Sequence, residues 1–136
     1  MNASTWNILI VDDSLEIVEV LSFTLQGSRF DGRPSSILRA HTKEEAARIL
    51  SHRDDIDLAV IDAKLVHSDD GFQLAHWIRY GIGNQRIRLI LYTGHLRDET
   101  FQQWVLPGLF DAYLPKQDSS IEVIRNSVDA ALASLA

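Results

Sequence analysis

The stretch Leu58-Ala59-Val60-Ile61-Asp62 is a short apolar run that ends abruptly at a carboxylate. A run of this length between polar residues is typical of a strand that is buried on both faces. Asp62 is then expected at the carboxyl end of the strand, which is where open α/β sheets bind their ligands. Both the fold and the site are therefore predicted to be organised around this strand.

A second run of the same kind comes earlier in the chain. Residues 8–11 read Ile-Leu-Ile-Val and lead directly into Asp12 and Asp13. If the two strands are parallel neighbours, three carboxylates meet at one edge of the sheet. Carboxylates this close resist joint ionisation unless a cation lies among them, and such oxygen ligands suit Mg²⁺. The sequence thus predicts an acidic Mg²⁺ pocket in which Asp62 is available as a nucleophile.

The length and composition are those of one globular domain, spanning residues 1–136. No apolar run approaches the ~20 residues that span a bilayer, and the first residues lack a signal-peptide pattern, so no membrane contact is expected. The chain has no cysteine, which fits a reducing cytoplasm, the expected location. Its net charge of −6 argues against direct binding of nucleic acid.

Predicted strands and helices alternate along the chain. The strands are expected at 7–12, 36–40, 57–62, 87–92 and 112–114, and the helices at 15–26, 43–52, 71–80, 98–105 and from 121 onward. This alternation predicts an α/β fold: a doubly wound, five-stranded parallel sheet of order 2-1-3-4-5, as in a flavodoxin-like three-layer sandwich. In that order the first and third strands are neighbours. The topological switch point of the sheet, where the direction of the strand order reverses, falls between them.

Several helix ends carry recognisable signals. Ser14 is a predicted cap and Gly27 a predicted stop for the helix 15–26, and residues 42–45 form a capping box. The helix 15–26 is apolar on more than one side, which predicts burial between the sheet and its neighbours. The last helix, capped by Ser119 or Ser120, has a predicted core stripe of Ile121, Ile124, Val128, Leu132 and Leu135.

Polar groups end four of the predicted strands, and here the chain resembles a receiver domain of a bacterial two-component response regulator. The matching residues are 10–13 (Ile-Val-Asp-Asp), Asp62, 93–94 (Thr-Gly) and 112–116 (Ala-Tyr-Leu-Pro-Lys). Each motif alone is weak, but their correct order at strand ends is specific, and the resemblance covers essentially the whole chain.

The resemblance implies a set of roles at the pocket. Asp62 matches the phosphorylated aspartate. Asp13 and Asp62 match direct Mg²⁺ ligands, Asp12 matches a residue that acts mainly through water, and the main-chain carbonyl of Lys64 is a further ligand. Lys116 matches the lysine that pairs with a phosphoryl oxygen. The chemistry is consistent, because a carboxylate is a competent nucleophile for forming an aspartyl phosphate, and cations offset the charge that develops.

The resemblance also implies a switch. Thr93 matches the hydroxyl that moves to the phosphoryl group, and Tyr113 the aromatic ring that follows it. The surface of the fourth helix, fifth strand and fifth helix would then control a partner or output domain, or form a homodimer through the fourth and fifth helices. The expected donor is a histidine kinase or phosphotransfer protein. The expected chemistry is at most Mg²⁺-dependent self-phosphorylation and autodephosphorylation at Asp62, not turnover of a substrate.

The sequence departs from the receiver pattern in three places. Gln117 follows Lys116 where a proline is usual, and Pro115 precedes it, which calls the usual cis bond of this loop into question. The loop 65–71 lacks a proline and is one residue longer. Lys64 lies two positions after Asp62, where its side chain could overhang the pocket. Three further segments resemble receivers fused to cyclic di-GMP-handling modules: residues 30–34, 69–71 and 83–88.

Two other functions stay open at this stage. One is a receiver-like interaction scaffold that is not regulated by phosphorylation: the intact acidic set argues against it, and Lys64 and the altered loops keep it open. The other is an aspartyl-nucleophile phosphatase of the haloacid dehalogenase type, but that class has its nucleophile after the first strand. Tyr113 as plain core and Lys64 as a solvated loop lysine remain the alternatives for those two residues.

Overall fold

The five strands form one fully parallel sheet of order β2-β1-β3-β4-β5 in a computed structural model that describes residues 5–94 and 108–136. Their bounds are β1 Trp6–Val11, β2 Ser35–Ala40, β3 Leu58–Ile61, β4 Arg88–Thr93 and β5 Ala112–Pro115. The predicted doubly wound, flavodoxin-like fold class is thereby confirmed. The predicted strand 57–62 is shorter in the structure, so Asp62 follows β3 directly.

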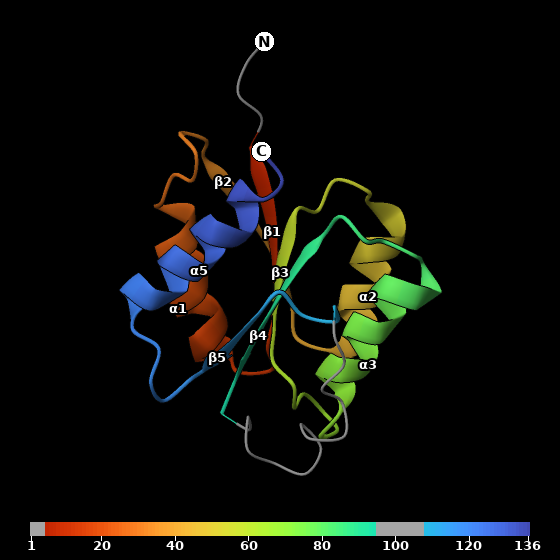
Figure 1. The fold of residues 1–136 in the computed structure, drawn as a ribbon. Coiled ribbons are helices and arrows are strands. Elements are labelled where there is room, and N and C mark those ends of the chain that lie inside the picture. Colours follow the sequence, from red (N-terminus) through yellow and green to blue (C-terminus); the bar gives the residue numbers. More distant parts are fainter. Residues whose placement is uncertain (1–4, 95–107) are drawn as a thin grey trace.

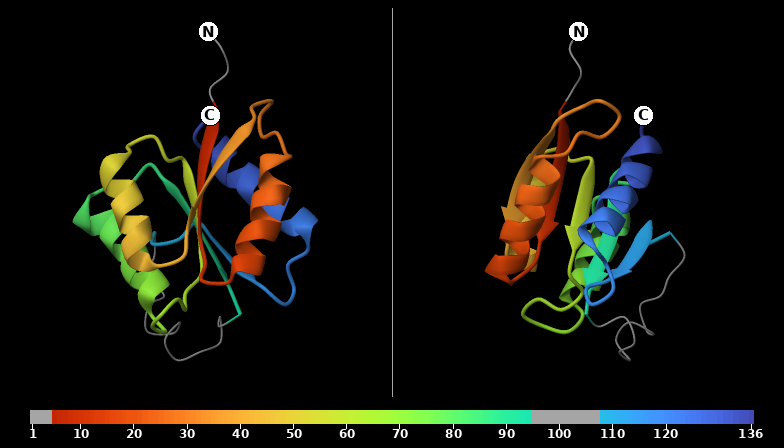
Figure 2. Two further views of the ribbon diagram at one scale, coloured as in Figure 1. Left: turned by 180° about the vertical axis from the view of Figure 1, so that it is seen from behind. Right: turned by 90° about the vertical axis from the view of Figure 1, so that its left-hand side faces the viewer.

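Helices cover both faces of the sheet. α1 (Leu15–Gln26) and α5 (Ile121–Ala133) lie on one face, and α2 (Lys43–His52) and α3 (Asp70–His76) lie on the other (Figure 1, Figure 2). The single helix expected at 71–80 is instead α3 continued by a π-helical turn, η1 (Trp77–Gly81). The helix predicted at 98–105 lies outside the described residues. None of the described helices is both long and apolar enough to cross a membrane.

Three helices begin at hydroxyl residues that the sequence singled out. Ser14 caps α1, Thr42 caps α2 and Ser120 caps α5, each by accepting the N–H of the residue three positions later. The capping box differs in one bond: the Glu45 carboxylate accepts the N–H of His41 at 2.7 Å, one residue earlier than the usual reciprocal partner.

The prediction that α1 is buried on more than one side is wrong. The helix packs on the sheet through Val18, Leu21 and Leu25, whereas Val20 and Phe23 are exposed, Phe23 by 85%. A single helical layer covers this face of the sheet, so the outer side of α1 has no described element to pack against. Ile121 is likewise exposed and does not belong to the core stripe of α5.

The chain after β3 returns very close to the strand end. A Cβ on Gly71 would lie 2.1 Å from the carbonyl oxygen of Asp62, and the Gly71 N–H donates to the Ala63 carbonyl at 2.8 Å. Only glycine permits this approach. The start of α3 is therefore pressed against the main chain of Asp62, and this packing fixes the position of the site.

Candidate functional site

The register of the central strands brings the predicted carboxylates together. Val11 pairs with Ile61 across β1 and β3, so Asp12 and Asp62 leave the sheet side by side, and the Asp62 N–H donates to the Val11 carbonyl at 2.9 Å. Asp12 and Asp62 are buried, whereas Asp13 is exposed at the rim. One carboxylate oxygen from each of these three residues lies within 4.8 Å of the others.

Lys116 supplies positive charge to this cluster. The backbone N–H of Lys116 donates to the Thr93 carbonyl at 3.0 Å, which anchors the residue at the carboxyl end of β5. Its Nζ donates to Asp62 Oδ2 at 3.0 Å and forms an ion pair with Asp12 Oδ2 at 2.8 Å. The lysine predicted from the sequence thus bridges both buried carboxylates.

The charges of the site are incompletely balanced. Burial raises the pKa of Asp12 above its usual 3.8, and this effect outweighs the lowering by the nearby Lys116 ammonium and by the hydrogen bond from the Ser14 N–H. For Lys116, burial opposes the charged form, but contact with Asp12 and Asp62 is stronger and raises its pKa above 10.5. One ammonium group therefore holds its proton firmly, yet it does not fully compensate two buried carboxylates.

The donor set fits a small divalent cation. Asp12 Oδ2 is buried and, among the described residues, has no hydrogen-bond donor in suitable geometry, although the ammonium of Lys116 lies 2.8 Å away. Carboxylate oxygens in such a cluster suit Mg²⁺. Asp12, Asp13 and Asp62 are the residues that could hold it. The Lys64 N–H lies 3.4 Å from Asp62 Oδ1, which places the Lys64 peptide beside the same carboxylate.

The two predicted switch residues lie on adjacent strands. Thr93 is fully buried and pairs with Pro115, and Tyr113 pairs with Leu91 two positions earlier along β4. Thr93 and Tyr113 therefore share one face of the sheet. Tyr113 is half-buried, its ring packs edge-on against Phe110 with centroids 5.6 Å apart, and burial raises its pKa.

The departures from the receiver pattern have structural counterparts. No cis peptide bond occurs in the described residues, which include both bonds that flank Lys116. Gln117 donates from Nε2 to the Gly94 carbonyl at 3.4 Å and so joins the ends of β4 and β5. The Lys64 side chain is exposed.

Sequence reasoning missed two residues near the site. The ring of Tyr92 faces the Lys116 ammonium at 5.7 Å from its centroid. Asp70, read only as part of an Asp-Gly segment, is 3% exposed and contacts Lys43 and His67. A carboxylate directly before a glycine and an apolar helix was the available signal for Asp70. No sequence signal marked Tyr92, because an aromatic residue in a buried strand is ordinary core sequence.

The chain is similar to known proteins in sequence and in structure, although no family model matches it. It is 27% identical over 120 residues to 3'3'-cGAMP-specific phosphodiesterase 2 of Vibrio cholerae, a match that covers 88% of this chain and only 23% of that protein. The chain thus spans less than a quarter of the length of this relative.

Solved receiver domains superpose closely on the chain. The signal receiver domain of an HD domain-containing protein from Pseudomonas fluorescens Pf-5 has a TM-score of 0.80 at 23% identity, covering 99% of this chain and 92% of that one. The N-terminal domain of a response regulator/sensory box/GGDEF 3-domain protein from Carboxydothermus hydrogenoformans has a TM-score of 0.73 at 24% identity, covering 94% of each. The chain therefore has the fold of a response regulator receiver domain.

Proposed function

We propose that residues 1–136 act as a phosphoacceptor receiver whose modified residue is Asp62. The observation that carries this proposal is the buried Asp62 carboxylate at a strand end, with Lys116 Nζ 3.0 Å from its Oδ2 and two further carboxylates beside it. A carboxylate held in this way is a suitable nucleophile for a phosphoryl group. The expected donor is a histidine kinase or phosphotransfer protein.

The chemistry follows from the positions of the side chains. A carboxylate oxygen of Asp62 attacks the donor phosphorus, and the bond from phosphorus to the leaving atom of the donor breaks. Lys116 lies where it can pair with a phosphoryl oxygen. Mg²⁺, when bound by the Asp12–Asp13–Asp62 cluster, would supply further positive charge to the phosphoryl oxygens. Thr93, at the end of β4, would donate a hydrogen bond from its hydroxyl to the new phosphoryl group. The ring of Tyr113, in the adjacent strand, would then change its position.

The relatives suggest what such a receiver controls. The similar proteins from Vibrio cholerae, Pseudomonas and Carboxydothermus are, by name, a 3'3'-cGAMP-specific phosphodiesterase, an HD domain-containing protein and a response regulator/sensory box/GGDEF protein. We infer that the output of this chain is a cyclic dinucleotide-related domain or partner. A surface around β5 and α5 would transmit the signal and could also form a homodimer.

The test is phosphoryl uptake from acetyl phosphate in the presence of Mg²⁺, followed by mass spectrometry. The wild-type chain should gain one labile phosphoryl group, Asp62→Ala should gain none, and Asp129→Ala should behave as wild type, because Asp129 is an exposed carboxylate on α5. Uptake by Asp62→Ala at the wild-type rate would falsify the assignment.

A receiver-like scaffold without phosphorylation is the second candidate. The exposed Lys64 two positions after Asp62 and the Gln117–Gly94 contact favour it, since both are departures next to the pocket. Folded wild-type protein that takes up no phosphoryl group would support this candidate. Turnover of phosphate monoesters would instead indicate a phosphatase.

A further inference from the structure

The loop that follows Asp62 is held by a buried carboxylate and a lysine from another helix. Residues 63–69 form neither helix nor strand, and Val66, His67 and Ser68 are exposed. At the end of this loop Asp70 is 3% exposed. Its Oδ2 accepts the His67 N–H at 2.9 Å, so the carboxylate folds the loop back on itself.

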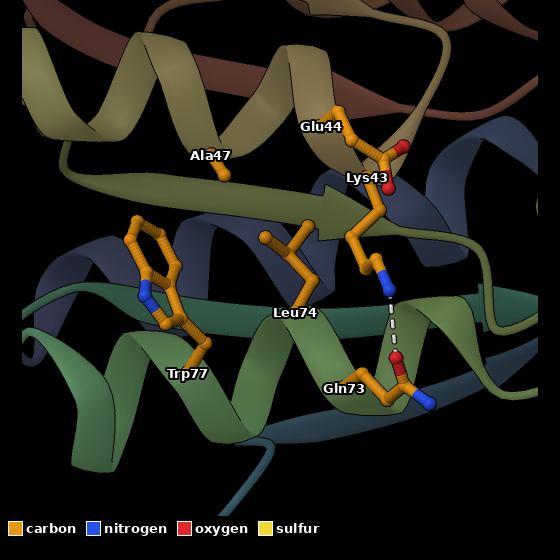
Figure 3. A pocket seen from close by; sticks show the side chains of 6 residues that line it. All are labelled: Lys43, Glu44, Ala47, Gln73, Leu74 and Trp77. Carbon is orange, nitrogen blue, oxygen red and sulfur yellow. Dashed lines mark hydrogen bonds between the residues drawn. The ribbon is translucent and has the colours of Figure 1, made fainter.

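The charge of Asp70 is balanced from α2. Lys43 Nζ lies 3.5 Å from Asp70 Oδ1 and donates to Gln73 Oε1 at 2.7 Å. Figure 3 shows Lys43 extending from the first turn of α2 towards Gln73 on α3. The second cation near Asp70 in the described part of the chain is His67, whose side chain is 76% exposed and which is charged only when protonated. A buried carboxylate that loses its cation is strongly destabilised.

The same loop carries groups of the proposed metal site. Lys64, whose N–H lies 3.4 Å from Asp62 Oδ1, is within it. The Gly71 N–H closes it on the Ala63 carbonyl. No proline or glycine lies between Ala63 and Asp70 to preset its conformation. Burial of Ala63 and Leu65 in the core and the main-chain bonds from Leu65 and Asp70 to the His67 carbonyl hold the two ends of the loop. The exposed middle, residues 66–68, is held besides by the charge at Asp70.

We propose that Lys43 is a positioning residue of the phosphoacceptor site: through Asp70 it holds the loop that places the Lys64 peptide and Asp62 for cation binding. This inference rests on the proposed function. It predicts an effect opposite to that of simple electrostatics. Removal of a positive charge near an acidic site should by itself tighten Mg²⁺ binding, whereas loss of the Lys43 anchor should weaken it.

The experiment compares Lys43→Met with Lys43→Arg and with Arg48→Met. Arg48 is an exposed residue on the same helix, so Arg48→Met removes the same charge without touching Asp70. Amide hydrogen exchange without Mg²⁺ should show at least tenfold faster exchange of the His67 and Gly71 amides in Lys43→Met. Calorimetry should show its Mg²⁺ Kd raised at least fivefold. Lys43→Arg and Arg48→Met should stay within twofold of wild type in both measurements.

The outcomes separate this inference from the proposed function. If Lys43→Met melts at a lower temperature but keeps the wild-type Kd and loop exchange, Lys43 is only structural and the inference is wrong, while the receiver function stands. Tighter Mg²⁺ binding in Lys43→Met would mean that charge alone acts, which also overturns the inference. Absence of Mg²⁺ binding in the wild-type protein would refute the proposed function itself, and the positioning role with it.

Discussion

Two clusters of charged residues in this molecule are built differently. The site cluster consists of Asp12, Asp62 and Lys116 at the carboxyl end of the sheet. The arginine cluster consists of Arg79, Arg88 and Asp111, where η1 meets the starts of β4 and β5. Both contain groups that are almost fully buried: Asp12 is 2% exposed and Arg79 is 4% exposed.

The arginine cluster satisfies its central charge. Arg79 Nη1 donates to the carbonyls of Asn84 at 3.1 Å and Ile87 at 2.6 Å, and Nη2 pairs with Asp111 at 3.2 Å. Asp111 also accepts the Leu89 N–H at 2.8 Å. Burial lowers the pKa of Arg79, and the charge of Asp111 opposes this effect.

The site cluster leaves charge uncompensated. In the part of the chain that the structure describes, two buried carboxylates share one ammonium, and Asp12 Oδ2 lacks a hydrogen-bond donor in suitable geometry. Burial of charge is therefore not what distinguishes a site from a structural element. Arg88 Nε of the arginine cluster is also buried without a described hydrogen-bond partner, so the distinction lies in the central groups: the guanidinium nitrogens of Arg79 meet two carbonyls and Asp111, whereas Asp12 is left for a ligand to satisfy. Substitutions in the two clusters should consequently affect different measurements.

The largest effect is expected in the arginine cluster. Arg79→Met should lower the free energy of unfolding by about 3 kcal/mol, because it removes the hydrogen bonds to two carbonyls and the buried ion pair with Asp111, which keeps only the Leu89 N–H and Arg88 among the described residues. Urea unfolding would measure it. Mg²⁺ affinity of the folded variant should remain within twofold of wild type. Arg125→Met is the control, since Arg125 is exposed and, within the described part of the chain, its side chain hydrogen-bonds to Ser28; this variant should change stability by less than about 0.5 kcal/mol. Equal losses in the two variants would remove the contrast between the clusters.

A smaller effect is expected where the site meets the core. Thr93→Ala should still accept the phosphoryl group on Asp62 but lose most of the response at Tyr113. A hydrogen bond to a charged group contributes roughly 1.5–3 kcal/mol, which is about a ten- to hundredfold bias between two states. The measurement is the change in chemical shifts of residues 108–118 on adding beryllofluoride, a phosphoryl mimic.

The matched control for this variant is Thr24→Ala. Thr24 is a buried threonine of α1, away from the pocket, and its substitution should leave the response to beryllofluoride intact. A full response in Thr93→Ala would show that the coupling follows another route and that Tyr113 is a core residue.

The smallest effect concerns the uncompensated charge itself. Because burial raises the pKa of Asp12, its ionised form destabilises the fold at every pH above that raised pKa, and the penalty disappears below 3.8, where the group is neutral in both states. Asp12→Asn should therefore raise the thermal midpoint at pH 7 without Mg²⁺, with each 1 kcal/mol appearing as about 3–6 °C. The Asn side chain can still accept the Ser14 N–H.

The pH and metal dependence provide the check. The difference in midpoint between Asp12→Asn and wild type should shrink as the pH falls towards 3.8, and Mg²⁺ should stabilise the variant less than it stabilises wild type. A lower midpoint for the variant at pH 7 would mean that the ion pair with Lys116 outweighs the cost of burying the Asp12 charge. The charge of the site cluster would then be compensated after all.

Much of this architecture could be predicted from local sequence. The apolar runs that end in Asp12 and Asp62 determined the two central strands, because a strand buried on both faces needs apolar side chains along its whole length. The hydroxyl caps determined where α1, α2 and α5 begin, since capping depends on residues three positions apart. The meeting of the carboxylates followed from the parallel order of the strands.

Burial and long-range pairing were decided only by the tertiary structure. The apolar residues Val20 and Phe23 of α1 are exposed because only one layer of the described helices covers that face, and periodicity within a helix cannot show how many neighbours the helix has. The link from Lys43 to Asp70 spans two helices, and the Arg79 network joins η1 to β4 and Asp111. Such contacts depend on the register and distance of separate elements, so the sequence determined which groups were available and the packed fold determined which of them would meet.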